Sequence, residues 1–298
     1  MATTRIRSEP PLVVIVGPTA SGKTGLAVRI AKAFNGEVIS ADSRALYKDL
    51  TIGTAKPTLK EQQGVPHWGI DLVMPGKRFT AADFKEYAVR KIDEIRARGH
   101  MPILAGGTGL YIDAVLYDFE FPSVDNNTTK RDELMNMALE QLHKHCADNN
   151  INLPENSKNK RHVVNNILRN GQELKRKHKL DENIIVVGIA TEKSVLRQRI
   201  EQRADVIVSP AIIDEAAQAG EKYGWDNEAM TGNIYPLVHQ YLNGELTLNE
   251  VKEKFITGDW RLAKRQLTWF RRNEHIQWLA LDDAYTYIAR HIDKLNNL

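Results

Sequence analysis

Short apolar runs alternate with segments of helical periodicity over much of the chain. The runs are rich in branched residues and have the length of buried parallel strands; they cover Leu12–Val16, Glu37–Ser40, Met101–Ala105 and Ile184–Ala190. Apolar residues recur at three- and four-residue spacing in Lys23–Phe34 and Ala81–Gly99, which predicts amphipathic helices. Strands that alternate with helices predict an α/β fold in which helices flank a mostly parallel sheet.

The segment Phe121–Leu180 has a different pattern. It contains no convincing strand, and its helical stretches, Lys130–Cys146 and Arg161–Lys177, are joined by a polar loop. We therefore predict a helical insertion domain at 121–180 within a core formed by 1–120 and 181–298. Later in the core, the pattern predicts a strand at Ile276–Leu281 and helices at Lys193–Val206, Pro210–Lys222, Asn249–Phe255 and Arg261–Arg272.

The positive charge of the chain is gathered in two clusters. The 298 residues, 42% of them hydrophobic, suffice for one large core and a smaller module, and the formal net charge is only +3. One cluster runs from Lys158 to Lys179 with eight Lys or Arg against the single acid Glu173, and the other runs from Trp260 to Arg272 with five and no acid. Such clusters attract polyanions or form ordinary solvated faces.

The cysteine count and the N-terminal residues bear on the cellular setting. Cys146 is the single cysteine, so the chain has neither an internal disulfide nor a multi-cysteine metal site, and we expect Cys146 to pack in a core. Met1–Pro11 lacks the apolar segment of a signal peptide, and no run approaches the ~18 apolar residues of a membrane span. These features predict a cytoplasmic protein without a membrane partner.

One glycine-rich turn carries the strongest chemical signal. It matches G-x-x-x-x-G-K-[ST], follows a predicted strand and opens a predicted helix, as a phosphate-binding P-loop requires. Backbone N–H groups and the helix N-terminus would surround phosphate oxygens, a lysine would add a full charge, and the final threonine would place its hydroxyl on Mg²⁺. The diphosphate-binding residues are therefore predicted to be Gly17, Pro18, Thr19, Ala20, Ser21, Gly22, Lys23 and Thr24, in a P-loop NTPase-like core.

Two further features are predicted at the same edge of the sheet. Many P-loop NTPases hold their metal with an aspartate after a strand, but the third strand here runs into Gly106-Gly107-Thr108-Gly109 without a carboxylate. Asp42 ends the second strand instead, where ligands of open α/β sheets bind, although an aspartate there can also cap a helix. The glycines after the third strand would let a ligand approach closely, and Thr108 would present a hydroxyl to it.

Taken together, the motifs resemble the tRNA dimethylallyltransferase family. The resemblance runs from about Leu12 to Tyr117 and resumes near the C-terminus. Besides the P-loop, it rests on Ser-Ala-Asp-Ser-Arg at 40–44, Ile-Gly-Thr-Ala-Lys-Pro at 52–57, Gly-Gly-Thr-Gly-Leu-Tyr at 106–111, Ala-Lys-Arg-Gln at 263–266 and Thr-Trp-Phe-Arg at 268–271.

The resemblance implies a reaction and a role for each motif. The family transfers a dimethylallyl group from its diphosphate to N6 of an adenosine next to the anticodon of tRNA. Asp42 would accept the proton that the amine loses, and Thr108 would hydrogen-bond the bridging oxygen of the leaving group, with Mg²⁺ as the cofactor. Contacts to tRNA are implied for Ser43, Arg44, Ala45, Lys130, Lys160, Arg161, Arg261, Lys264, Arg265 and Arg271. We expect a monomer.

The chain also departs from the family pattern, near Ala217, at Pro236 and at Trp260. Trp269 and Phe270 fit either an RNA-stacking surface or a core. Three other functions remain open: a small-molecule kinase that uses ATP, a catalytically inactive RNA-binding protein, and a prenyltransferase that acts on a free adenine nucleotide. The kinase is disfavoured by the absent aspartate after the third strand, and the second basic cluster favours tRNA over a free nucleotide.

Overall fold

A parallel sheet forms the centre of the protein. The computed structural model describes residues 9–122, 128–173, 175–177 and 179–296. Within them the strands lie in the order β3-β2-β4-β1-β5-β6, and every neighbouring pair is parallel. The strands are β1 (Leu12–Val16), β2 (Gly36–Ala41), β3 (His67–Trp68), β4 (Met101–Gly106), β5 (Ile184–Ile189) and β6 (Gln277–Leu279).

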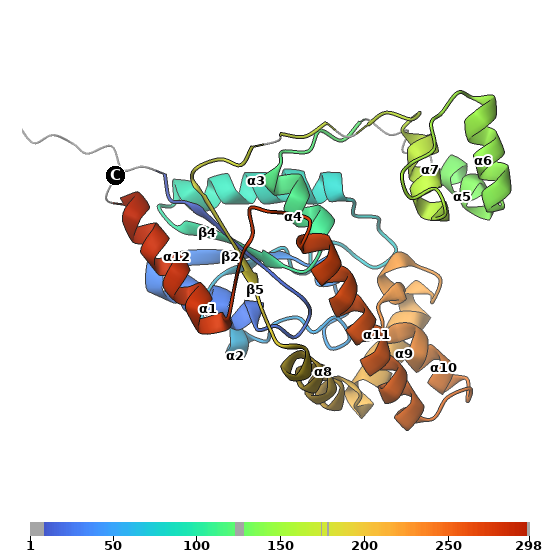
Figure 1. The fold of residues 1–298 in the computed structure, drawn as a ribbon. Helices are drawn as coiled ribbons and strands as arrows, with labels where there is room; N and C mark the ends of the chain where they lie inside the picture. The colour runs from blue at the N-terminus through green and yellow to red at the C-terminus, as the bar shows by residue number, and fades with distance from the viewer. Residues whose placement is uncertain (1–8, 123–127, 174, 178, 297–298) are drawn as a thin grey trace, which may run out of the picture. The chain divides into compact units, whose positions relative to one another are not determined.

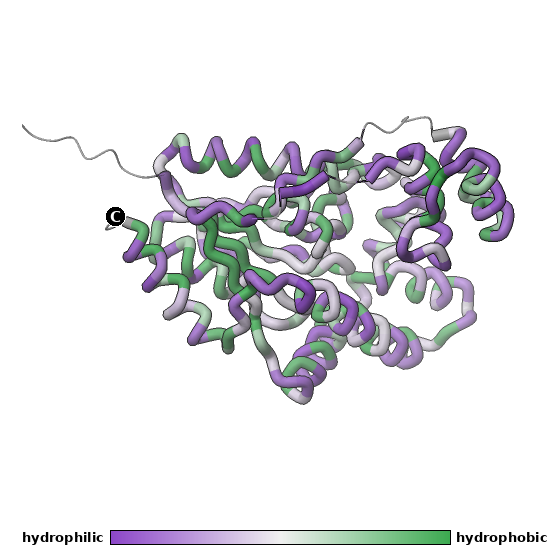
Figure 2. The backbone as a smooth tube through the Cα atoms, turned by 45° about the horizontal axis from the view of Figure 1, so that its top comes forward, coloured by the Kyte–Doolittle hydropathy of each residue, from purple (hydrophilic) through white to green (hydrophobic). Residues whose placement is uncertain are grey.

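Helices cover both faces of this sheet (Figure 1). On one face, α1 (Lys23–Phe34) and α12 (Leu281–Asn296) pack against β1, β2, β4 and β5 in a shared core that includes Ile30 and Ile288. On the other face lie α3 (Ala81–Ala97) and α4 (Gly109–Leu116), which contact each other and β4. The short α2 (Leu59–Gln62) contacts α1. Hydrophobic residues gather on the central strands, which explains why these strands form unbroken apolar runs in the sequence (Figure 2).

A group of helices follows β5 in sequence. It consists of α8 (Lys193–Ile207), α9 (Pro210–Tyr223), the short 3₁₀ helix η1 (Glu228–Thr231), α10 (Tyr235–Leu242) and α11 (Leu248–Phe270). The two helices predicted at 249–255 and 261–272 are one continuous helix, so the predicted break was wrong. Gly258 lies inside α11 without ending it, because Asn233 packs beside it and donates a hydrogen bond to the buried Asp259.

The chain divides into two compact units, Met1–Leu116 with Leu180–Leu298 and Tyr117–Lys179. In the second unit the connecting segments pair, because Lys177 N–H donates to Tyr117 O at 2.8 Å and Glu120 N–H donates to Lys175 O at 2.9 Å. The unit has its own small core, to which Leu142, Cys146 and Val163 contribute. Cys146 is thus buried in packing, as the sequence predicts.

The helices of the second unit are shorter than predicted. Instead of one helix over 130–146 there are α5 (Thr128–Asn136) and α6 (Leu139–Asp148), separated at Ala138, whose backbone is extended. In place of the helix over 161–177, α7 (Lys160–Leu168) ends early because Asn170 and Gly171 adopt left-handed conformations.

Most predicted elements of the core are confirmed to within about two residues. The pattern missed the short α2 and β3 and the helices α4, α10 and α12. No helix in the described ranges is long and apolar enough to cross a membrane. The prediction for Met1–Pro11 falls largely on residues 1–8, which lie outside the described ranges.

Candidate active site

Three loops meet at the carboxyl edge of the sheet because their strands are in register. Gly106 of β4 pairs with Val16 of β1 on one side and with Ala41 of β2 on the other. The residues that come next, Gly17, Asp42 and Gly107, therefore start their loops side by side. The P-loop, the candidate base and the second glycine-rich turn are brought together, as the sequence predicts.

The P-loop has the backbone geometry of an anion cradle. Gly17 and Gly22 adopt positive φ values of 153° and 92°, and Ala20 lies in the left-handed region at 61°. The ammonium of Lys23 donates to the carbonyl of Pro18 at 2.6 Å. Burial lowers the pKa of Lys23 to about 8; Arg203 contributes to this lowering, and Asp42 opposes it. Lys23 and Asp42 thus lie close enough for an electrostatic attraction.

Two arginines of α8 contact the P-loop. Arg203 donates to the hydroxyl of Thr19, and Arg199 donates to the carbonyl of Ser21 at 3.3 Å. Neither arginine is among the site residues predicted from the sequence. Their four-residue spacing places them on the same face of one predicted helix. This spacing is the feature of the sequence that could have identified them.

Asp42 caps a turn rather than a helix. One of its carboxylate oxygens, Oδ1, accepts the backbone N–H of Arg44 at 2.8 Å, and no helix follows directly. This local bond uses one oxygen and fixes the direction of the side chain. Within the described residues no hydrogen bond to Oδ2 is formed, so the carboxylate retains a site for a proton.

Thr108 joins the second glycine-rich turn to the residues after Asp42. Its N–H donates to the carbonyl of Ala41 at 3.1 Å, and its hydroxyl oxygen accepts the N–H of Ser43 at 3.0 Å. The hydroxyl also lies 3.3 Å from the hydroxyl of Ser43. The two predicted catalytic side chains, Asp42 and Thr108, are therefore held by the same short stretch of backbone.

Helix α11 fixes the spacing of the two glycine-rich loops. The side chain of Gln266 accepts the N–H of Thr19 at 2.7 Å and donates to the carbonyl of Gly107 at 3.1 Å. A Cβ at Gly107 would lie 2.3 Å from Gln266 Nε2, and a Cβ at Gly109 would lie 2.2 Å from the Trp269 ring. The close approach of α11 thus requires a glycine at 109, and a side chain at 107 would displace the amide of Gln266.

One departure from the family pattern, Trp260, lies next to the P-loop and follows the buried Asp259 in α11. Asp259 is 3% exposed, and burial raises the pKa of its carboxyl group, although Arg203 and Asn233 oppose the rise. Its neighbour Trp260, one of the departures, packs with Ala20 of the P-loop against Leu196, Ile200 and Ala263. Trp260 thus adds an apolar side chain beside the P-loop at a position where the chain departs from the family pattern.

The residues with an implied tRNA contact fall into three groups. Ser43 and Arg44 are half-buried beside Asp42, and the neighbouring Ala45 is buried. On α11, Arg261, Lys264 and Arg265 form one exposed face, and exposed Arg271 caps the end of the helix. In the second unit, Lys130 and Arg161 are exposed and Lys160 is half-buried.

Trp269 and Phe270, for which RNA stacking and core packing were both open, differ from each other. Phe270 is fully buried, so it belongs to the core. Trp269 is half-buried over Gly109 and donates its indole N–H to Asp113 at 2.8 Å. Both aromatic residues thus serve the docking of α11 rather than a free stacking surface.

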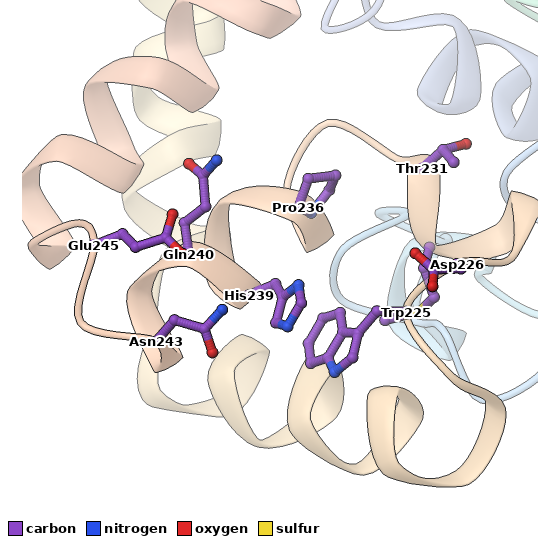
Figure 3. A pocket seen from close by; sticks show the side chains of 9 residues that line it. Trp225, Asp226, Thr231, Pro236, His239, Gln240, Asn243 and Glu245 are labelled. Carbon is purple, nitrogen blue, oxygen red and sulfur yellow. The ribbon is translucent and has the colours of Figure 1, made fainter.

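A pocket of about 360 Å³ lies elsewhere in the first unit (Figure 3). It includes Pro236, another departure position, together with Trp225 and His239, whose rings stack at a centroid distance of 4.1 Å. Its lining contains none of the P-loop residues and neither Asp42 nor Thr108. Pro236 therefore lines this pocket and not the phosphate cradle.

The side chains near the cradle bear on the expected Mg²⁺. In the part of the chain that the structure describes, no group of three or more His, Cys, Asp and Glu side chains is placed to hold a metal ion. Thr24 is exposed in the first turn of α1. This donor set fits a magnesium ion that takes most of its oxygens from a bound diphosphate and water.

Comparisons with known proteins agree on one family. A family model described as IPP transferase matches residues 45–273. The chain is 38% identical to a tRNA dimethylallyltransferase of Acetivibrio thermocellus, covering 91% of this chain and 92% of the relative. It is 37% identical to the tRNA dimethylallyltransferase of Bacillus subtilis, covering 91% of each.

Solved structures share the fold. A full-length tRNA isopentenylpyrophosphate transferase from Bacillus halodurans superposes with a TM-score of 0.74 at 34% identity, covering 97% of this chain and 99% of that one. A eukaryotic dimethylallyltransferase acting on tRNA has a TM-score of 0.73 at 23% identity, covering 91% and 74%. Both neighbours support the P-loop NTPase-like fold. The Bacillus halodurans enzyme and the curated relatives favour prenyl transfer over the kinase alternative. The chain therefore belongs to the IPP transferase family.

Proposed function

We propose that the protein transfers a dimethylallyl group from dimethylallyl diphosphate to N6 of an adenosine adjacent to the anticodon in tRNA. The observation that carries the proposal is the convergence of the P-loop, Asp42 and Thr108 at one sheet edge, in a chain of this family. The carbon–oxygen bond of the prenyl diphosphate breaks, and a carbon–nitrogen bond to the adenine forms. The diphosphate leaves with the electron pair of the broken bond.

Residues 17–24 hold the leaving diphosphate. The backbone of Gly17–Thr24 and the ammonium of Lys23 neutralise the charge that develops on the diphosphate oxygens. Arg203 and Arg199 orient this loop and add positive charge beside it. Thr24 would hold Mg²⁺, which supplies Lewis-acid stabilisation to the diphosphate when bound.

Asp42 acts on the attacking amine, and Thr108 acts on the leaving group. Asp42 accepts the proton that N6 loses as it attacks, through the oxygen that the Arg44 amide does not use. Thr108 donates its hydroxyl hydrogen to the bridging oxygen of the leaving group. Its oxygen meanwhile accepts the Ser43 amide, which fixes its orientation.

The basic surfaces bind tRNA. The exposed face of α11, with Arg261, Lys264 and Arg265, supplies phosphate contacts, and Lys130, Lys160 and Arg161 supply further contacts from the second unit. The target adenine leaves its stack to reach Asp42, at a cost of a few kcal/mol. We propose that the protein acts as a monomer, and a tRNA substrate fits the cytoplasmic location expected from the sequence.

The test is incubation of the protein with Mg²⁺, dimethylallyl diphosphate and unmodified tRNA, followed by mass spectrometry of the nucleosides. We expect a prenylated adenosine from tRNA and none from free adenine nucleotides. Asp42→Asn preserves the acceptor for the Arg44 amide, so we expect an intact fold, unchanged diphosphate binding and a rate lower by about 10²–10⁴. Absence of product from the wild-type protein, with turnover of ATP instead, would favour the kinase; absence of both would favour an inactive RNA-binding protein.

A further inference from the structure

A carboxylate of α9 holds the loop that follows Asp42. Glu215 accepts three consecutive backbone N–H groups through its two oxygens, from Thr51 at 2.8 Å, Ile52 at 2.7 Å and Gly53 at 3.0 Å. Ile52 and Gly53 begin the Ile-Gly-Thr-Ala-Lys-Pro motif, and Thr51 directly precedes it. The motif has no role in the proposed chemistry so far. Hydrogen bonds to an ionised acceptor are stronger than those between neutral groups, so Glu215 is a firm anchor for this loop.

A buried tyrosine of α10 supports this anchor. The hydroxyl of Tyr235 donates to the same carboxylate at 2.8 Å, and Tyr235 is fully buried. Burial, together with the charge of Glu215, raises the pKa of Tyr235 above its usual range, so the hydroxyl remains a donor. A Cβ at Gly53 would lie 2.6 Å from the Tyr235 ring, which explains why the loop has a glycine at this point.

Neighbouring contacts bind the same loop to the same helices. Asp49 accepts hydrogen bonds from Lys222 at 2.9 Å and from Tyr223 at 2.5 Å, both at the end of α9. The guanidinium of Arg44 donates to the carbonyl of Glu228 in η1 at 2.7 Å. The Asp49 contacts are exposed and contribute little, whereas two of the three Glu215 contacts, those from Ile52 and Gly53, are partly buried. The third, from Thr51, is exposed.

We propose that Glu215 is a positioning residue that fixes the loop from Ser43 to Gly53, and with it the side chains of Ser43 and Arg44 that receive the RNA. The inference rests on the proposed function, because the consequence that we expect is productive binding of the acceptor tRNA. The loop that Glu215 anchors, at residues 51–53, is separate from the P-loop at residues 17–24. Glu215 therefore governs the use of tRNA and leaves the binding of the diphosphate unchanged.

Glu215→Gln tests the proposal, with Asp214→Asn as the matched control. Glutamine has the same length but offers one acceptor oxygen and an N–H₂ group that repels the amides. The control removes an equal charge from the preceding position of α9. We expect Glu215→Gln to lower kcat/KM for tRNA about tenfold or more, with the Kd for dimethylallyl diphosphate changed less than twofold, and Asp214→Asn to match the wild type.

Hydrogen exchange tests the anchor itself without any activity. We expect faster amide exchange in Glu215→Gln, confined to peptides that cover residues 51–53, and no change in Asp214→Asn. Equal exchange and equal kinetics in the two variants would overturn the proposal, and so would a parallel loss of diphosphate and tRNA binding. An inactive wild-type protein with the expected exchange pattern would overturn the proposed function and leave the anchor standing.

A second variant, Gly53→Ala, changes the anchored loop instead of Glu215. Gly53→Ala places a Cβ against the Tyr235 ring and pushes the amides away from Glu215 without changing any charge. We expect the same selective loss of tRNA use and the same local rise in exchange. If Glu215→Gln fails to fold, Gly53→Ala decides the question, and wild-type kinetics for tRNA in that variant would overturn the proposal.

Discussion

The hydroxyl oxygen of Thr108 accepts the backbone N–H of Ser43 at 3.0 Å, which links the end of β4 to the end of β2. The bond orients the threonine and leaves its own hydrogen available to a ligand. In the present structure that hydrogen is directed to the hydroxyl of Ser43, 3.3 Å away, a long and weak contact that a bound diphosphate can replace. The side chain is therefore already in place before the substrate arrives.

A hydroxyl at position 108 should be essential to the rate. Thr108→Ser keeps the hydroxyl and should retain activity within about tenfold. Thr108→Val keeps the shape but removes both the acceptor for Ser43 and the donor to the leaving group, so we expect kcat to fall by about 10² or more. Steady-state kinetics with saturating tRNA measures both variants. Equal activity of Thr108→Val and the wild type would show that the hydroxyl has no part in the reaction.

Gly109 should tolerate no side chain. A Cβ there would lie 2.2 Å from the Trp269 ring and would disturb the indole bond to Asp113, so we expect Gly109→Ala to lower the free energy of unfolding by about 1–3 kcal/mol. Gly25, on the exposed side of α1, has no neighbouring atom within 4 Å of the position that a Cβ would take, and Gly25→Ala should be neutral or stabilising by up to about 1 kcal/mol. Denaturant unfolding compares the two, and similar effects at both positions would contradict the packing argument.

The sequence predicts the parts of the site that are local and repeat a known geometry. The P-loop, Asp42 and Thr108 each follow an apolar run, and the parallel sheet brings such positions to one edge. Gln266 and Glu215 could not be found in this way. Gln266 contacts Thr19 across 247 positions, and Glu215 contacts Thr51 across 164, so their roles depend on how α11 and α9 pack.

Dependence on tertiary packing and turn geometry also explains the helix boundaries that were predicted wrongly. Gly258 in α11 has low helix propensity, but the packing of Asn233 and the burial of Asp259 keep the helix continuous. In the second unit the opposite holds, since the helical periodicity past Leu168 is overruled by two residues in left-handed conformations. Tertiary contacts and turn geometry thus decide what periodicity leaves open.

Diphosphate binding should weaken in alkaline solution. The pKa of Lys23 is lowered to about 8, chiefly by burial, so the free enzyme loses this positive charge as the pH rises through that value. We expect the affinity for inorganic diphosphate, measured by calorimetry, to fall by up to tenfold per pH unit above about pH 8. Lys23→Met should bind diphosphate more weakly at neutral pH and should lack this dependence on pH. Any dependence that remains in Lys23→Met comes from ionisation of the ligand and serves as the correction. Parallel pH profiles for the two proteins would contradict the assignment.

Acid stability should depend on Glu37, at the opposite end of β2 from Asp42. Burial alone would raise the pKa of Glu37, but hydrogen bonds from Arg98, His100 and Trp68 outweigh it and lower the value from 4.5 to about 2. A lowered pKa of an acid stabilises the fold above pH 4.5, and this stabilisation is lost as the pH falls towards 2.

The size of this contribution can be measured against a surface carboxylate. The lowering of the pKa from 4.5 to about 2 corresponds to on the order of 3 kcal/mol, and the Glu37 side chain is only 3% exposed. We expect Glu37→Gln to lower the free energy of unfolding at neutral pH and to flatten its decline between about pH 4.5 and 2. Glu94→Gln removes an ion pair to Lys91 in which the glutamate side chain is 41% exposed, and it should change the curve much less than Glu37→Gln does. If the two variants unfold alike at every pH, the buried cluster around Glu37 does not supply the acid sensitivity.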